Sequence, residues 1–224
     1  QIEREREELE HAEETRAMLE AELAGHLSAL RETGRRLGAA RLAAGERLST
    51  AMQKELADLS MSGARFELQL TPLSEPGPTG LERGEFLLAP NRGEALLPLA
   101  RIASGGELSR ILLALKRVTP GTEQVPTLVF DEVDAGIGGA TATAVGEKLQ
   151  AVSRRAQVLC VTQLPQVAAG AARHFLVSKR EVAGRTVTGV VPLAGEERVL
   201  EMARMLGGAQ VTERTLDHAR ELIG

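Results

Sequence analysis

The first 62 residues contain no proline and repeat apolar side chains at heptad-like spacing. These positions are Leu9, Ala12, Leu19, Leu23, Leu27, Leu30, Leu37, Ala44, Leu48, Met52, Leu56 and Leu59. An unbroken helix over this stretch reaches about 90 Å at 1.5 Å per residue. A heptad stripe on so long a helix is typical of a coiled-coil arm, which needs a partner helix. A surface helix of a helical bundle is the alternative interpretation.

Four glycines interrupt this helical pattern, at Gly25, Gly34, Gly38 and Gly45. Each costs up to about 1 kcal/mol of helix propensity. We therefore expect packing against another helix to stabilise the arm where local preference does not.

Composition excludes several classes of protein. The chain lacks an apolar run of membrane-spanning length and a secretory leader, so no membrane contact is expected and the cytoplasm is the expected location. The four histidines have no metal-ligand spacing, and the single cysteine, Cys160, lies in an apolar run that predicts a buried core residue.

The net charge of −4 argues against a generally basic nucleic-acid binder, so any DNA contact must be local. Basic residues gather at three places. They are Arg31, Arg35, Arg36, Arg41 and Arg47 in the arm, the pair Arg154 and Arg155, and residues 173–180. An ordinary solvated face is one interpretation of each group, and contact with phosphates is the other.

After residue 63 the apolar period changes, and the pattern predicts an α/β lobe over residues 63–224, with the arm over residues 1–62. Strands are expected at 65–70, 81–89, 95–102, 127–131 and 156–162, with a loop at 72–80. Helices are expected at 107–118, 140–152, from Pro165, and at 196–206 and 212–223. The nearly all-apolar strands at 127–131 and 156–162 predict a parallel sheet covered on both faces, with residues 174–179 and 186–192 as an antiparallel edge hairpin.

The first candidate site opens the helix at 107–118. Ser104, Gly105, Gly106 and Glu107 fit a capping box, in which the serine and the glutamate satisfy each other's backbone amides. The two glycines leave the backbone bare, so an anion can approach the free amides and the positive end of the helix dipole. This segment alone is compatible with two interpretations, a helix cap without a ligand and a contact with a phosphate.

The second candidate site follows the buried strand at 127–131. Asp131 and Glu132 stand at its carboxyl end, where open α/β sheets bind ligands. There Asp131 can hold Mg²⁺ and Glu132 can activate the water that attacks a γ phosphate. Asp134 follows in a glycine-rich turn, and the strand at 156–162 brings Gln163 to the same edge, where a polar side chain can sense the γ phosphate. The alternative interpretation is that these acids form an exposed turn without a binding role.

No stretch of the chain fits the phosphate-gripping G-x-x-x-x-G-K-[ST] loop, so these motifs indicate half of an ATPase. Their order resembles the signature loop, Walker B strand, D-loop and switch strand of an ABC-type head. The residues of four segments, 102–110, 130–138, 161–167 and 203–208, closely resemble motifs of the SMC-like RecN family of bacterial DNA repair proteins. The resemblance covers residues 86–224, and the arm agrees only in being a heptad helix.

The resemblance implies the C-terminal lobe of an ABC-type head with a returning arm helix. Expected partners are an N-terminal Walker A lobe and an opposing arm helix of the same protein, a second copy of the head, and DNA. Ser104, Gly105, Gly106 and Glu107 would contact ATP bound mainly by the opposite head, while Asp131, Glu132 and Asp134 would serve the head's own ATP and Mg²⁺. The implied function is ATP-driven head dimerisation and DNA tethering in repair of double-strand breaks.

One position departs from the family pattern Thr-His-Leu-Pro-Gln-Val, because Gln163 replaces the histidine. An amide can bond a phosphate oxygen or a water, but it carries no positive charge. Two alternatives to the RecN family remain from the sequence. They are another SMC-like ATPase with a coiled-coil arm, and a coiled-coil scaffold without enzyme activity, since this chain by itself has no Walker A loop and is expected to be inactive.

Overall fold

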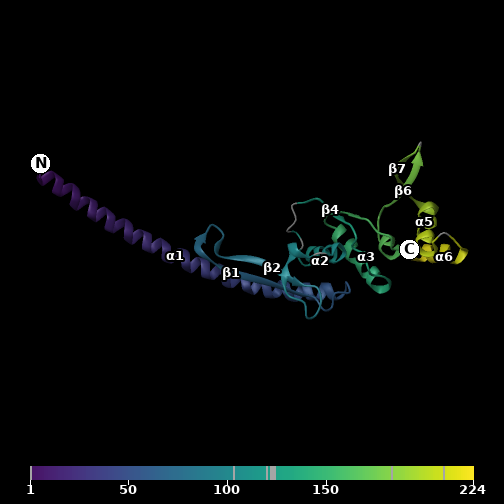
Figure 1. Cartoon of the computed structure of the whole chain (residues 1–224), viewed down its shortest axis with the longest axis horizontal. Coiled ribbons are helices and arrows are strands. Elements are labelled where there is room, and N and C mark those ends of the chain that lie inside the picture. The colour runs from purple at the N-terminus through teal and green to yellow at the C-terminus, as the bar shows by residue number, and fades with distance from the viewer. Residues whose placement is uncertain (1, 103, 120, 122–124, 183, 209) are drawn as a thin grey trace. The chain divides into compact units, whose positions relative to one another are not determined.

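A computed structural model describes residues 2–102, 104–119, 121, 125–182, 184–208 and 210–224, apart from the side chains at 4, 5, 7–10 and 182 (Figure 1). The chain forms two compact units. The first is Gln1–Ser49 with Glu67–Leu87, and the second is Thr50–Phe66 with Leu88–Gly224. No helix in the described ranges is long and apolar enough to cross a bilayer.

The predicted long helix is present as α1, Ile2–Ala57, drawn in purple to blue in Figure 1. It ends five residues before the expected boundary. The amides of Leu59 and Met61 both donate to the carbonyl of Leu56, and Ser60 takes the left-handed backbone conformation with φ of 59°. The end of α1, from Thr50, already belongs to the second unit, and this turn buries the side chains of Leu56, Leu59 and Met61 in its core.

Within the first unit, a β-hairpin rather than a helix packs against the glycines of α1. Strand β1, Arg65–Gly77, and strand β2, Gly80–Ala89, supply this hairpin. Leu81 lies against Gly34, Glu82 against Gly38, and Leu68 against Gly45, so closely that a side chain at each glycine would displace them. The close approach of the hairpin explains Gly34, Gly38 and Gly45, whereas no described atom lies within 4 Å of a side chain at Gly25. At these three glycines the packing partner is therefore a strand rather than the predicted helix.

The hairpin is longer than its sequence indicates. The loop predicted at 72–80 is wrong, because β1 runs through Pro72 and Pro76 to Gly77. In the three-stranded sheet of order β1-β2-β3, strand β1 lies at an edge, where proline's missing N–H costs no ladder bond if it faces outward. The strand predicted at 95–102 shrinks to β3, Leu97–Pro98, because the short helix η1, Leu99–Arg101, begins directly after it.

The second unit contains the predicted α/β arrangement. Helix α2, Gly105–Val118, precedes strand β4, Thr127–Phe130, and helix α3, Gly139–Ser153, precedes strand β5, Gln157–Cys160. Strands β4 and β5 pair in parallel, with Thr127 opposite Gln157 and Phe130 opposite Cys160. The parallel pair confirms the α/β class and brings the carboxyl ends of both strands to one edge.

The predicted cover on both faces of this sheet is wrong for the described residues. Val129 is 67% exposed, Leu159 48% and Val161 60%. The chain therefore leaves apolar strand side chains in contact with solvent.

Five further elements complete the second unit. They are helix α4, Pro165–Ala169, strands β6, His174–Val182, and β7, Arg185–Leu193, and helices α5, Gly195–Gly207, and α6, Glu213–Ile223. Met202, Ala203, Ala219 and Ala168 form a small core between α4, α5 and α6. Strands β6 and β7 are antiparallel as predicted, but in the described residues they form a sheet of their own instead of the edge of the parallel sheet.

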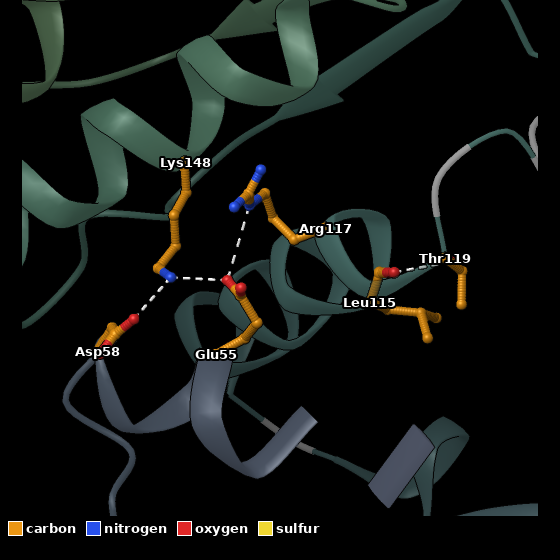
Figure 2. A network of polar contacts seen from close by, with 6 residues as sticks. All are labelled: Glu55, Asp58, Leu115, Arg117, Thr119 and Lys148. Carbon is orange, nitrogen blue, oxygen red and sulfur yellow. Dashed lines mark hydrogen bonds and ion pairs between the residues drawn. The ribbon is translucent and has the colours of Figure 1, made fainter. Parts of the chain in front are cut away.

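A network of polar side chains joins the last turn of α1 to α2 and α3 (Figure 2). The buried Lys148 of α3 donates to Glu55 at 2.6 Å and to Asp58 at 2.9 Å. Arg117, in the last turn of α2, lies 3.7 Å from the same Glu55 carboxylate. The amino group of Lys148 thus bridges two carboxylates that lie about 90 residues away along the chain.

Candidate functional site

The start of α2 carries the first candidate site. Ser104 is the N-cap, and its hydroxyl accepts a hydrogen bond from the amide of Glu107 at 3.4 Å. The reciprocal bond of a capping box, from the Glu107 side chain back to Ser104, is not among the hydrogen bonds of the described residues. Ser104 and Gly105 are exposed, so the amino end of α2, where anions bind favourably, is reached by solvent.

The two glycines of this loop differ in environment. Gly106 is buried, and a methyl group there would lie 2.9 Å from Cβ of Ala135 and 3.0 Å from the carbonyl oxygen of Glu132. Gly105 lies directly against the Glu132 carboxylate. Gly106 is therefore required by the close approach of residues 132–135, which the sequence did not reveal, and Gly105 leaves room for the Glu132 carboxylate.

The acidic pair follows β4, as predicted. Asp131 is exposed, and its carboxylate accepts a hydrogen bond from the amide of Glu132 at 2.9 Å. Glu132 is exposed and has a φ of 56°, a left-handed conformation that is uncommon outside glycine. This backbone turn carries the Glu132 side chain to the start of α2, so the two predicted motifs meet within one chain.

Asp134 and Gln163 are joined by a hydrogen bond that sequence reasoning missed. One oxygen of the half-buried Asp134 carboxylate accepts from the hydroxyl of Thr162 at 2.5 Å and from the amide of Gln163 at 3.0 Å. The amide of Val161 also donates to the carbonyl of Phe130 at 2.9 Å. The exposed Gln163 is thus held at the same sheet edge as Asp131, which confirms the predicted placement.

Ser109 and Arg110 of α2 belong to this site although the sequence assigned them no role. The hydroxyl of Ser109 donates to the carbonyl of Asp131 at 2.7 Å. The guanidinium of Arg110 donates to the carbonyls of Ala135 at 2.9 Å and Val133 at 3.4 Å. Arg110 lies about one and a half turns into α2, and an arginine beside the apolar Ile111 was the available signal in the sequence.

The donor set fits a magnesium ion bound mainly through phosphate and water. In the described residues no group of three or more His, Cys, Asp or Glu side chains gathers. Mg²⁺ commonly uses one or two protein carboxylates together with waters and substrate phosphates. Asp131, exposed at the end of β4, supplies such a carboxylate.

Cys160 lies beneath this edge and is half-buried rather than fully buried. Burial, with smaller contributions from the Asp134 and Asp131 carboxylates, raises the pKa of the Cys160 thiol to about 12. The thiol is therefore neutral at physiological pH, in agreement with its interpretation as a packing residue.

Comparison with curated proteins shows which proteins the chain is similar to. It is 44% identical over 220 residues to the DNA repair protein RecN of Streptomyces coelicolor, a match that covers 93% of this chain and 37% of that protein. The chain is homologous to RecN. RecN of Deinococcus radiodurans is 44% identical over 215 residues, covering 96% of this chain and 38% of that protein, and RecN of Treponema pallidum is 43% identical over 211 residues, covering 92% and 37%.

These matches confirm the resemblance drawn from the motifs and extend it. Cover of 92% to 96% of the chain includes most of the arm, which the motifs alone placed outside the resemblance. The chain spans well under half of the length of the RecN proteins it matches. No protein-family model matches the chain.

Among solved structures, the chain is similar to Smc head domains. The Smc head with a coiled coil and joint from Pyrococcus yayanosii is 22% identical with a TM-score of 0.48, covering 70% of this chain and 28% of that chain. The Smc head with an extended coiled coil from Pyrococcus furiosus is 23% identical with a TM-score of 0.44, covering 71% and 38%. Both scores lie below 0.5, so this likeness carries no argument about the present chain.

Proposed function

We propose that the chain is the C-terminal head lobe and returning arm of a RecN-type ATPase, which closes two heads on ATP and tethers DNA ends during recombinational repair of double-strand breaks in the bacterial cytoplasm. Relationship to RecN supports the ATPase class and the repair role. The observation that carries the proposal is the edge at which exposed Ser104 and Gly105, Asp131 with Glu132, and Gln163 come together.

The proposed chemistry assigns a role to each of these groups. The open amides at Ser104 and Gly105 receive the γ phosphate of ATP held by the opposite head, with Gly106 and Glu107 shaping the loop. Asp131 holds Mg²⁺ on the head's own ATP, and Glu132 accepts a proton from the attacking water. Mg²⁺, when bound, neutralises charge that develops on the phosphate oxygens.

Two uncovered apolar surfaces support the proposed intramolecular partners. In parallel sheets both faces are normally covered, yet Val129, Leu159 and Val161 face solvent in this chain, which fits a Walker A lobe completing the sheet. Leu19, Leu23 and Leu27 of the α1 heptad stripe are 55%, 58% and 37% exposed, which fits an opposing arm helix.

The test is ATP hydrolysis by the chain alone, by the Walker A half of the same protein alone, and by the two mixed. We expect hydrolysis only from the mixture, with a lag or concentration dependence that reports assembly of the heads. Hydrolysis by this chain alone would contradict the proposed division of the ATP site, and an inactive mixture that forms a stable complex would contradict the ATPase assignment.

Changing Gln163→His is expected to raise the kcat of the reconstituted ATPase about fivefold to tenfold. The Asp134 carboxylate accepts from the backbone amide of residue 163, so its negative charge would favour the protonated form of the new imidazole and place a positive charge near the γ phosphate. Steady-state hydrolysis at pH 7 measures the effect, with Gln163→Asn as a neutral control. An unchanged kcat in the histidine variant would show that charge at this position does not limit hydrolysis.

A further inference from the structure

Arg110 is a buried cation that the proposed chemistry leaves unused. It is 8% exposed, and in the described part of the chain no carboxylate lies within ion-pair distance and no acceptor reaches its Nε atom. Burial lowers the pKa of the guanidinium, while the charge of Glu107 opposes that effect. Burying a charge without a paired carboxylate is costly, so its remaining contacts indicate why the position holds arginine.

Those contacts lie on one segment, the loop of residues 131–136 that carries the acidic pair. Arg110 donates to the carbonyls of Val133 and Ala135, and the preceding residue, Ser109, donates to the carbonyl of Asp131. Carbonyls of alternate residues in the loop therefore accept from two successive side chains of α2. Within the loop, the amide of Ala135 donates to the carbonyl of Glu132 at 3.0 Å. The Asp134 carboxylate of the same loop accepts from Thr162 and from the amide of Gln163, after β5.

Steric contact reinforces this attachment on the same face of α2, one turn before Arg110. Gly106 admits the loop so closely that a single methyl group would meet Ala135 and the carbonyl of Glu132. Three side-chain hydrogen bonds and a tight glycine contact thus attach the loop to α2, in addition to the bonds of Asp134 to the residues after β5.

We propose that Ser109 and Arg110 are positioning residues that fasten the acid-bearing loop to α2, so that the Ser104–Gly105 amides and the Asp131–Glu132 carboxylates move as one body. The effect of this attachment on ATP hydrolysis rests on the proposed function. Since the amides serve the ATP of the opposite head and the carboxylates serve the head's own ATP, the tether couples the two ATP sites of a closed dimer within each chain.

The tether itself is tested on this chain by amide hydrogen exchange. Arg110→Met and Ser109→Ala are expected to raise exchange of the amides at Ala135 and Ile137 about tenfold or more relative to those of β4, while Arg155→Met, at an exposed arginine, leaves them unchanged. Arg110→Lys retains the charge and is expected to restore part of the protection. If exchange rises equally in the loop and in β4, Arg110 supports the fold generally and the tether is wrong.

Coupling is tested in the reconstituted ATPase. A loop displaced by even 1 Å should lower kcat by about 10- to 100-fold in Arg110→Met with a nearly unchanged KM for ATP, because the phosphate-gripping half is intact. A raised KM with an unchanged kcat would overturn the positioning role. If the parent protein does not hydrolyse ATP, the proposed function fails, while the exchange measurement still decides the tether.

Discussion

Replacing Lys148 with methionine is expected to lower the free energy of unfolding by about 2–3 kcal/mol. The lysine side chain is 11% exposed and bonds Glu55 and Asp58, whose side chains are 18% and 56% exposed. The variant leaves two neighbouring carboxylates without their shared cation, and Arg117 at 3.7 Å from Glu55 replaces only part of that interaction. Because Asp58 is well solvated, we expect less than the full penalty of a broken buried ion pair. Urea unfolding measures the change.

Lys179→Met is the matched control, since this lysine is exposed on β6. The pH dependence gives a second check. The hydrogen bond from Lys148 holds the pKa of Asp58 below its usual range, so the contribution of this pair is present above the ordinary pKa of an aspartate and is lost as the pH falls through the lowered value. The difference between parent and variant should therefore shrink below pH about 4. Equal stability of Lys148→Met and the control at pH 7 would contradict the structural importance of the network.

Glu132→Gln is expected to reduce ATP hydrolysis by the reconstituted protein by at least about 100-fold and to trap ATP-bound dimers. The amide keeps the shape of the side chain, so ATP and the second head still bind, but it cannot accept a proton from the attacking water. Hydrolysis and size-exclusion chromatography with ATP measure the two effects. A neighbouring acid outside the site, Glu147→Gln on the exposed side of α3, serves as the control.

A Glu132→Gln variant that hydrolyses ATP at the parent rate would show that another group activates the water. One that is inactive but remains monomeric with ATP would contradict ATP-driven closure of the heads. Glu132 has a left-handed backbone conformation, and glutamine tolerates this conformation about as well as glutamate. A fall in thermal stability is therefore not expected from the substitution.

The helices and the two parallel strands were located well because their signals are local, although the predicted burial of the strands was wrong. The apolar spacing and the capping serine located α2 to within two residues, and the apolar runs located β4 and β5. The motif order placed Asp131, Glu132 and Gln163 at one edge, since parallel strands end on the same side.

Features that depend on distant partners were not visible in the sequence. The glycines of α1 accommodate a hairpin that begins at Arg65, eight residues after the helix ends at Ala57. Nothing in the sequence near Gly34 or Gly38 indicates that Leu81 and Glu82 pack against them. The bond between Asp134 and Gln163 links residues 29 positions apart, and the ion pairs of Lys148 span about 90. The prolines of β1 predicted a loop because the sequence does not show which strand lies at the edge of a sheet. An edge strand such as β1 tolerates proline.

The half-buried sulfur of Cys160 has a practical consequence for work on this chain. With a pKa of about 12, its reactive anion is on the order of one molecule in 100,000 at pH 7. Maleimide dyes and spin labels will then attach to an engineered surface thiol far faster than to the native one. Probes for head closure can be introduced at chosen positions without first removing the resident cysteine.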